Sequence, residues 1–139
     1  MQHNDLTTLS KAVFADDSYA TQTTGIELKD VGEHCSVCEL HIGPRHLNAR
    51  GAVMGGVLFT LADFAAAAAA NSDAVAEGIP LTWVSLDATI HYLAPVIGCD
   101  TLVAECEAIK HGRTSALYQT VIAAGGRRVA LVETTMAHI

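Results

Sequence analysis

The stretch that decides the fold runs from Asn48 to Asn71 and reads NARGAVMGGVLFTLADFAAAAAAN. From Gly55 onward it is rich in alanine and apolar at nearly every position, which predicts a helix from Gly55 to Asn71. A helix that is apolar on nearly every side must be surrounded by other elements. We therefore expect the rest of the chain to wrap it, and its single charge, Asp63, requires an explanation.

Strand-like segments flank this helix on both sides. A short amphipathic helix is expected from Leu6 to Ala15, then two strands before the central helix and four after it. The segment 82–92 alternates strictly, with residues 84, 86, 88, 90 and 92 on the core face and Ser85 and Asp87 on the other. An antiparallel sheet curved around one helix, an α+β fold, hides that helix most economically. The expected strands cover residues 26–29, 34–42, 82–92, 99–110, 113–124 and 127–138.

Composition limits the classes of function. The 139 residues fit one domain over 1–139, with 1–24 as an amino-terminal helix and connection. Eight basic against 15 acidic residues give a formal charge of −7, the wrong sign for a nucleic-acid partner. The weak hydrophobicity of alanine and the central Asp63 argue against a membrane span. The amino terminus has no signal-peptide pattern, so a cytoplasmic location is expected.

Four cysteines raise the question of a metal or disulfide site. Cys35 and Cys38 form a C-x-x-C, but in a strand a separation of three places the two thiols on opposite faces. Cys99 and Cys106 also differ by an odd number, and no second pair has zinc-ligand spacing. Reduced structural thiols, with no metal and no redox cofactor, are therefore expected.

Asp63 has a structural and a functional interpretation. It could accept hydrogen bonds from a loop or face water at an interface, or it could be a general base or nucleophile held in a pocket. Gly55 and Gly56 favour the second interpretation, because free backbone N–H groups at a helix start can stabilise an oxyanion. A tight entry into the helix would also explain the two glycines.

The length of the helix adds a constraint. Gly55 and Asp63 are eight residues apart, which is about 12 Å of helix rise. An oxyanion donor and a base that act on one carbonyl must each lie near their reacting atoms. One helix cannot supply both, so a joint role requires an antiparallel helix from a second copy. The sequence thus predicts an isologous homodimer with two composite sites.

Several motifs together resemble a known family. Asn48, Gly55-Gly56 and Asp63 are followed by Val84-Ser85-Leu86-Asp87, by the segment HYLAP at 91–95, and by Lys110-x-Gly112-Arg113. Their order and spacing resemble the hotdog-fold acyl-CoA thioesterases of the phenylacetic-acid-degradation (PaaI-like) type, from about Gly25 to His138. The resemblance implies hydrolysis of an acyl-CoA thioester without a cofactor, by a homodimer that pairs into a dimer of dimers.

The resemblance also implies roles for individual residues. Asp63 would be the nucleophile or the base that activates water, the Gly55 amide would polarise the thioester carbonyl, and Asn48 would assist it. Ser85 would orient water or Asp63 across the dimer interface. Substrate contacts are expected from Met54, Gly56, His46 and Arg113.

One position departs from the family pattern. Met54 precedes the glycine pair where the family commonly has histidine, and a thioether cannot make the hydrogen bonds of an imidazole. The alternative is therefore a non-catalytic acyl-CoA-binding or assembly module. A hotdog dehydratase is disfavoured because the helix and its entrance contain no histidine. The acyl group, the carrier (coenzyme A or an acyl carrier protein), the nucleophile-or-base question and the dimer-or-tetramer question stay open.

Overall fold

Six strands form one antiparallel sheet around a long helix in the computed structural model, which describes residues 1–98 and 100–139. The central helix α2 spans Gly55–Ala70, close to its predicted range. Three short elements were not predicted, the π-helix η1, the 3-10 helix η2 and the helix α3, because the turn-forming and polar residues in and around them indicate connecting loops. The other elements are α1 (His3–Phe14), η1 (Tyr19–Thr24), β1 (Glu27–Gly32), β2 (Cys35–His41), the 3-10 helix η2 (Pro44–His46), α3 (Ser72–Glu77), β3 (Trp83–Tyr92), β4 (Thr101–His111), β5 (Ser115–Ala124) and β6 (Arg127–His138).

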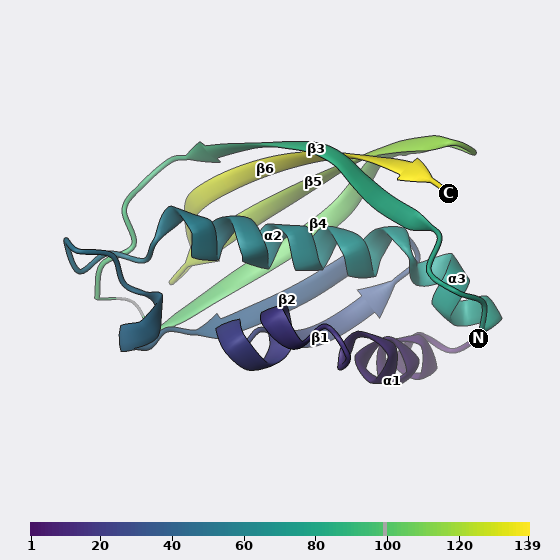
Figure 1. The fold of residues 1–139 in the computed structure, drawn as a ribbon, viewed down its shortest axis with the longest axis horizontal. Coiled ribbons are helices and arrows are strands. Elements are labelled where there is room, and N and C mark those ends of the chain that lie inside the picture. The colour runs from purple at the N-terminus through teal and green to yellow at the C-terminus, as the bar shows by residue number, and fades with distance from the viewer. Residues whose placement is uncertain (99) are drawn as a thin grey trace.

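The strand order β1-β2-β4-β5-β6-β3 places β3 at an edge, although it precedes β4 in the sequence. The chain leaves β2, crosses the sheet as α2, and returns as β3 beside β6 (Figure 1). It then crosses back so that β4 pairs with β2. The helix is therefore enclosed by the sheet from one side, as predicted.

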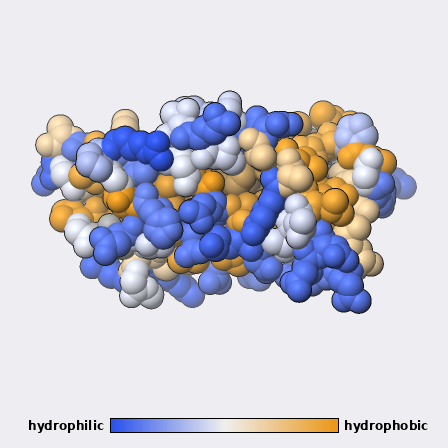
Figure 2. All heavy atoms as spheres, turned by 90° about the horizontal axis from the view of Figure 1, so that it is seen from below, coloured by the Kyte–Doolittle hydropathy of each residue, from blue (hydrophilic) through white to orange (hydrophobic). Residues whose placement is uncertain are grey.

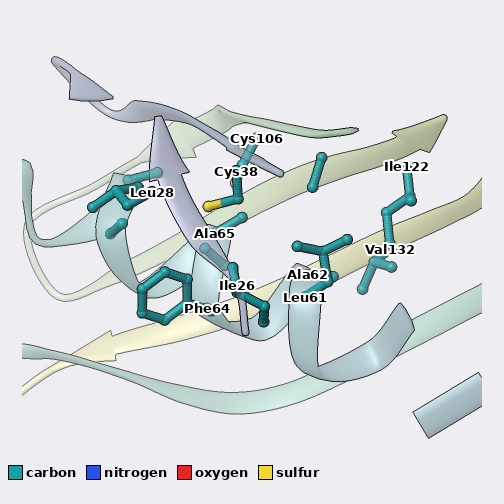
Figure 3. Close-up of a cluster of buried hydrophobic side chains, with 14 of the residues drawn as sticks. Ile26, Leu28, Cys38, Leu61, Ala62, Phe64, Ala65, Cys106, Ile122 and Val132 are labelled. Atoms are coloured by element: carbon teal, nitrogen blue, oxygen red, sulfur yellow. The ribbon is translucent and has the colours of Figure 1, made fainter. Parts of the chain in front are cut away.

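The core lies between α2 and the inner face of the sheet. Leu61, Ala62 and Ala65 of α2 are wholly buried and lie among side chains of β1, β2, β5 and β6 (Figure 3). The Ser36 hydroxyl of β2 donates a hydrogen bond to the Ala65 carbonyl oxygen at 2.7 Å. Such an approach of a strand to a helix backbone is possible because the intervening side chains are methyl groups.

One stripe of α2 is not covered. Gly56, Phe59 and Asp63 occupy one helix face and are exposed. The prediction that the chain wraps the helix completely is therefore wrong for this stripe. Elsewhere the apolar surround is present: the sheet covers one side, and Phe14 of α1 packs edge-on against Phe64 of α2 with ring centroids 5.7 Å apart.

Seen from the α1 side, hydrophilic and hydrophobic side chains are intermixed over the surface (Figure 2). None of the helices in the described part of the chain is long and apolar enough to cross a membrane.

The cysteines of the described residues are free thiols. Cys38 is buried opposite Ala104 on the inner face, whereas Cys35 pairs with Glu107 on the outer face, as their spacing predicted. Burial raises the pKa of Cys38 far above its ordinary value and raises that of Cys106 to about 12, so neither forms a thiolate at neutral pH. Cys99 lies outside the described residues.

Asn71 ties the carboxyl end of α2 to the start of β3. Its side chain is almost wholly buried. Nδ2 donates to the carbonyl oxygens of Ala67 (3.0 Å) and Trp83 (3.2 Å), and Oδ1 accepts from the N–H groups of Thr82 (3.0 Å) and Trp83 (2.9 Å). One amide thus satisfies backbone groups of two elements.

Replacing Asn71 by alanine is expected to lower the free energy of unfolding by about 3 kcal/mol or more, because buried backbone groups lose their partners. Urea unfolding followed by circular dichroism measures this. Thr8→Ala is the control, since the exposed Thr8 hydroxyl bonds only the Asn4 carbonyl oxygen of its own helix, at 3.0 Å; its effect should stay within about 0.5 kcal/mol. Similar losses in both variants would contradict the assigned role.

Candidate active site

The amino-terminal end of α2 presents free backbone donors. Met54 caps the helix in an extended conformation, and its carbonyl oxygen accepts from the N–H groups of Val57 at 2.9 Å and Leu58 at 3.4 Å. Gly55 and Gly56 are the first two helical residues, whose N–H groups have no carbonyl of a preceding turn to bond. These two donors and the positive end of the helix dipole suit an oxyanion.

Gly55 has a close neighbour in the side chain of Tyr92. A Cβ atom built at this position would lie 2.8 Å from the hydroxyl oxygen of Tyr92, at the end of β3. Tyr92 is 55% exposed and therefore borders the helix start from the solvent side. The sequence did not identify Tyr92 as a site residue; the available signal was Gly55 itself, because a glycine in a first helical turn marks a close approach.

Asp63 lies on the exposed stripe of α2, two turns beyond Gly55. The Ser85 hydroxyl of β3 donates a hydrogen bond to Asp63 Oδ1 at 3.2 Å. A bulge at Leu86 makes this contact possible: Ser85 pairs with Met136, but Asp87 pairs with Thr135. Because directly paired residues share a face and Met136 is buried, the bulge turns Ser85 toward the helix.

Two predictions about β3 are therefore corrected. The segment does not alternate strictly, because Val84 and Leu86 are exposed rather than on the core face with Ala88. Asp87 does not share a face with Ser85, since the bulge lies between them. The structure shows a contact between Ser85 and Asp63 within one chain, and the predicted role of Ser85 across a dimer interface stays a prediction.

Asn48 shapes the loop before the helix. Its Oδ1 accepts from the N–H groups of Arg50 at 2.9 Å and Ala52 at 3.1 Å, and its own N–H donates to the Ala52 carbonyl oxygen at 2.7 Å. The side-chain oxygen thus fixes the loop conformation. The Nδ2 group is the part of this exposed side chain that can donate to a ligand.

His46 has a structural position instead of the predicted substrate contact. It is 3% exposed; its Nδ1 accepts from the Gly43 N–H at 2.9 Å, and Nε2 lies 2.7 Å from the Thr24 carbonyl oxygen. Both ring nitrogens are therefore bonded within the chain. Its carbonyl oxygen also accepts from the Met54 N–H at 2.9 Å, so His46 positions the helix entrance indirectly.

Arg113 lies far from Gly55 in the same chain. It is exposed in the turn after β4, beside the strand row that contains Ser115, Ala137 and Val84. Tyr92 borders Gly55 at the other end of β3, about 25 Å away at about 3.3 Å per residue. Arg113 and Gly55 therefore lie at opposite ends of β3 in one chain.

Within one chain the candidate oxyanion donors and the candidate carboxylate do not meet. The donors at Gly55 and the carboxylate of Asp63 are separated by about 12 Å of helix. Asn48 and Met54 lie with the donors, and Ser85 lies with the carboxylate. One chain thus holds two half-sites, an oxyanion-binding half and a carboxylate half.

Comparisons with known proteins identify the family and the fold. A family model described as the thioesterase superfamily matches residues 50–136. The acyl-coenzyme A thioesterase PaaI of Escherichia coli strain K12 is 31% identical over 111 residues, which are 80% of this chain and 74% of that protein. The structure of the E. coli PaaI protein from the phenylacetic acid degradation operon matches with a TM-score of 0.82 and 26% identity, covering 96% of both chains.

A hypothetical thioesterase protein from Streptococcus pneumoniae TIGR4, solved with coenzyme A, matches with a TM-score of 0.76 and 25% identity over 91% of this chain and 96% of that one. The chain belongs to the thioesterase superfamily, whose model matches more than half of its length. Within that superfamily it is a PaaI-like member with the α+β hotdog fold. The predicted fold, family and enzyme class, a thioester hydrolase, are confirmed.

Proposed function

We propose that this protein hydrolyses acyl-CoA thioesters to a free acid and coenzyme A. The observation that carries the proposal is the pair of half-sites on α2, a carboxylate held by Ser85 and a helix start with two free N–H groups. The names of the relatives agree: one is an acyl-coenzyme A thioesterase, and a similar structure was solved with coenzyme A.

In the proposed reaction, the Gly55 N–H binds the thioester carbonyl oxygen, with the Asn48 amide assisting. Asp63 either takes a proton from the attacking water or attacks the carbonyl carbon itself, in which case water then cleaves the acyl–enzyme intermediate. The carbon–sulfur bond breaks, and coenzyme A leaves as the thiol after protonation. Ser85 holds the Asp63 carboxylate, and Met54 and Gly56 border the substrate. The reaction uses no cofactor.

A homodimer would join the two half-sites. Several apolar side chains of α2, its entrance and β3 are exposed, namely Met54, Phe59, Val84, Leu86 and Tyr92. The edge strand β3 has one charged residue, Asp87, and no lysine, arginine or proline, the residues that commonly protect an edge from pairing. The opposite edge strand, β1, is protected by Lys29, which lies 3.5 Å from both Glu27 and Glu39. We therefore place the interface at β3 and α2.

The symmetry of such a dimer identifies its centre. If antiparallel α2 helices bring Gly55 of one chain to Asp63 of the other, the two-fold axis passes midway between these positions, at Phe59. Phe59 is apolar, 37% exposed and on the same stripe as Asp63. It is thus suited to contact its own copy. The same arrangement lets Arg113 reach the substrate of the partner's site.

The tetramer and the cytoplasmic location stay predictions. The pairing of dimers into a tetramer would require a second surface, and the outer face of the sheet offers a groove bordered by Val37, Val121 and Leu131. A cytoplasmic location, expected from the sequence, would suit a substrate attached to coenzyme A.

Thiol release from a panel of short, long and aromatic acyl-CoAs tests the proposed function. We expect turnover on at least one class, with a kcat/KM of about 10⁴ M⁻¹s⁻¹ or more. Calorimetry with the same compounds is the companion measurement. Saturable binding without thiol release would overturn the proposal and support the binding-module alternative, which Met54 motivates. Equal panels of acyl-carrier-protein thioesters identify the carrier.

A further inference from the structure

Two histidines and an aspartate converge beyond the carboxyl end of α2, away from Gly55. His34 lies in the turn between β1 and β2, Asp73 lies in the first turn of α3, and His111 is the last residue of β4. One potential metal-ligand atom from each residue lies within 4.8 Å of the other two. Three elements that are distant in sequence thus place metal-ligand side chains together at this end of the molecule.

We propose that His34, Asp73 and His111 bind one divalent transition-metal ion of the zinc class. Two imidazoles and a carboxylate are donors that suit zinc, nickel and cobalt and not magnesium or calcium, which prefer oxygen alone. The site is separate from Asp63 and independent of the proposed hydrolysis. The ion would be structural, because it would connect the β1–β2 turn, α3 and the end of β4.

The backbone holds His34 in an unusual conformation beside α3. Its φ is 55°, a left-handed value that no other non-glycine residue adopts in the described part of the chain. The His34 N–H donates to the Ser72 hydroxyl at 2.9 Å, and His34 Nε2 lies 2.8 Å from Asp73 Oδ2. Two neighbouring residues of α3 therefore anchor both the backbone and the ring of this turn residue.

The environment of His111 leaves one nitrogen for a ligand. The Tyr118 hydroxyl lies 2.7 Å from Nδ1, so Nε2 is the free ring nitrogen. A hydrogen bond at one nitrogen that orients the other is the usual arrangement around histidines that bind metals. The fully buried Tyr118 fixes this orientation from the core side.

Binding requires one local rearrangement. The rings of His34 and His111 are stacked, with centroids 3.7 Å apart and an interplanar angle of 17°. A metal ion lies in the plane of each imidazole that binds it, so one ring must turn out of the stack. His34 and Asp73 can adjust, because their side chains retain 22% and 53% of their solvent exposure.

The single tryptophan of the chain provides a local reporter. Trp83 is the only tryptophan in the sequence, and its ring centroid lies 4.6 Å from that of His111. A paramagnetic ion bound at His111 should therefore quench its fluorescence. Zinc, which does not quench by this route, should reverse the effect by displacement.

The test uses the full chain without an added histidine tag, after dialysis against a chelator. We expect zinc to bind with one equivalent per chain in calorimetry, nickel to quench Trp83, and magnesium to do neither. Saturating zinc should raise the melting temperature by about 5 °C. His111→Ala and Asp73→Asn should each weaken zinc binding by at least about 10-fold. Asp73→Asn preserves the shape of an exposed side chain, so it decides the question if His111→Ala fails to fold.

His3→Ala is the matched control. His3 Nε2 lies 2.6 Å from Asp30 Oδ1, so this exposed pair resembles that of His34 and Asp73, but the group of three includes neither residue. Its replacement should leave zinc binding and nickel quenching unchanged. The proposal is overturned if zinc does not bind below about 100 μM, a limit far weaker than that of structural zinc sites. It is also overturned if Asp73→Asn binds as tightly as the unaltered chain, or if His3→Ala weakens binding equally.

Discussion

Replacing Asp63 by alanine is expected to lower kcat for acyl-CoA hydrolysis by at least about 100-fold, because the reaction loses its base or nucleophile. Folding should be unaffected, since the side chain is exposed in the single chain. Within the described residues its side-chain hydrogen bond is the one from Ser85. Alanine also has the highest helix propensity. Thiol release on the best acyl-CoA measures kcat. Circular dichroism and sedimentation of the same sample measure the folding and the mass of the variant.

Two further variants separate chemistry from position. Asp63→Asn keeps the size of the side chain and can still accept from Ser85, but an amide is neither a base nor a nucleophile, so the loss should match that of the alanine variant. Ser85→Ala keeps the carboxylate and removes only its 3.2 Å hydrogen bond, so a loss of about 10-fold is expected. Wild-type turnover by Asp63→Asn would exclude Asp63 from the reaction.

The central helix and the positions of Gly55 and Asp63 on it were predictable from the sequence because their signals are local. A run of alanines has few other uses, a lone carboxylate in such a run is conspicuous, and a glycine pair at a helix start indicates close approach. The distance between Gly55 and Asp63 also follows from helix rise alone. These arguments require no knowledge of the tertiary contacts of the helix.

The orientation of Ser85 could not be derived in the same way. Strict alternation assigns it to the face opposite Ala88, and only the bulge at Leu86 reverses this. A bulge depends on the register with β6, which is distant in sequence, so the alternation of β3 does not encode it. The assignment of Ser85 to the site came from the family resemblance.

Other features depend on tertiary structure in the same sense. His46 lies near the site in sequence, yet Thr24 and Gly43 use both of its ring nitrogens. The group of His34, Asp73 and His111 comes from three elements with no spacing motif. The apolar pattern of α2 does not indicate which face of the helix the sheet covers, so the uncovered stripe could not be predicted from it.

Replacing Phe59 by lysine is expected to convert the proposed dimer to monomers and to lower thioesterase activity by at least about 100-fold, because in the proposed arrangement each site needs both subunits. The substitution places two like charges near the two-fold axis, since every change in an isologous interface occurs twice. Sedimentation velocity and thiol release on one preparation measure mass and turnover together.

Leu9→Lys is the matched control for this substitution. Leu9 is 41% exposed on α1, close to the 37% of Phe59, but lies away from the stripe that contains Asp63. The same change in chemistry there should leave both mass and turnover unaltered. Phe59→Leu, which keeps an apolar side chain at the axis, should retain the dimer. If the Phe59→Lys chain stays dimeric, the interface does not lie at this helix.

A loss of activity in Phe59→Lys could also follow from direct damage to a site within one chain, and mixing two inactive variants separates these cases. Gly55→Pro removes the N–H donor at a first helical position where proline is tolerated, after an extended Met54 with ψ of 138°. Its ring must displace the flexible end of Tyr92. In heterodimers of Gly55→Pro and Asp63→Ala chains, one composite site contains both defects and the other contains neither. Random pairing should therefore restore about a quarter of wild-type activity. If each site lay within a single chain, every site in the mixture would retain one defect and activity would not recover. The shared site is therefore excluded if a mixture proved to contain heterodimers stays inactive.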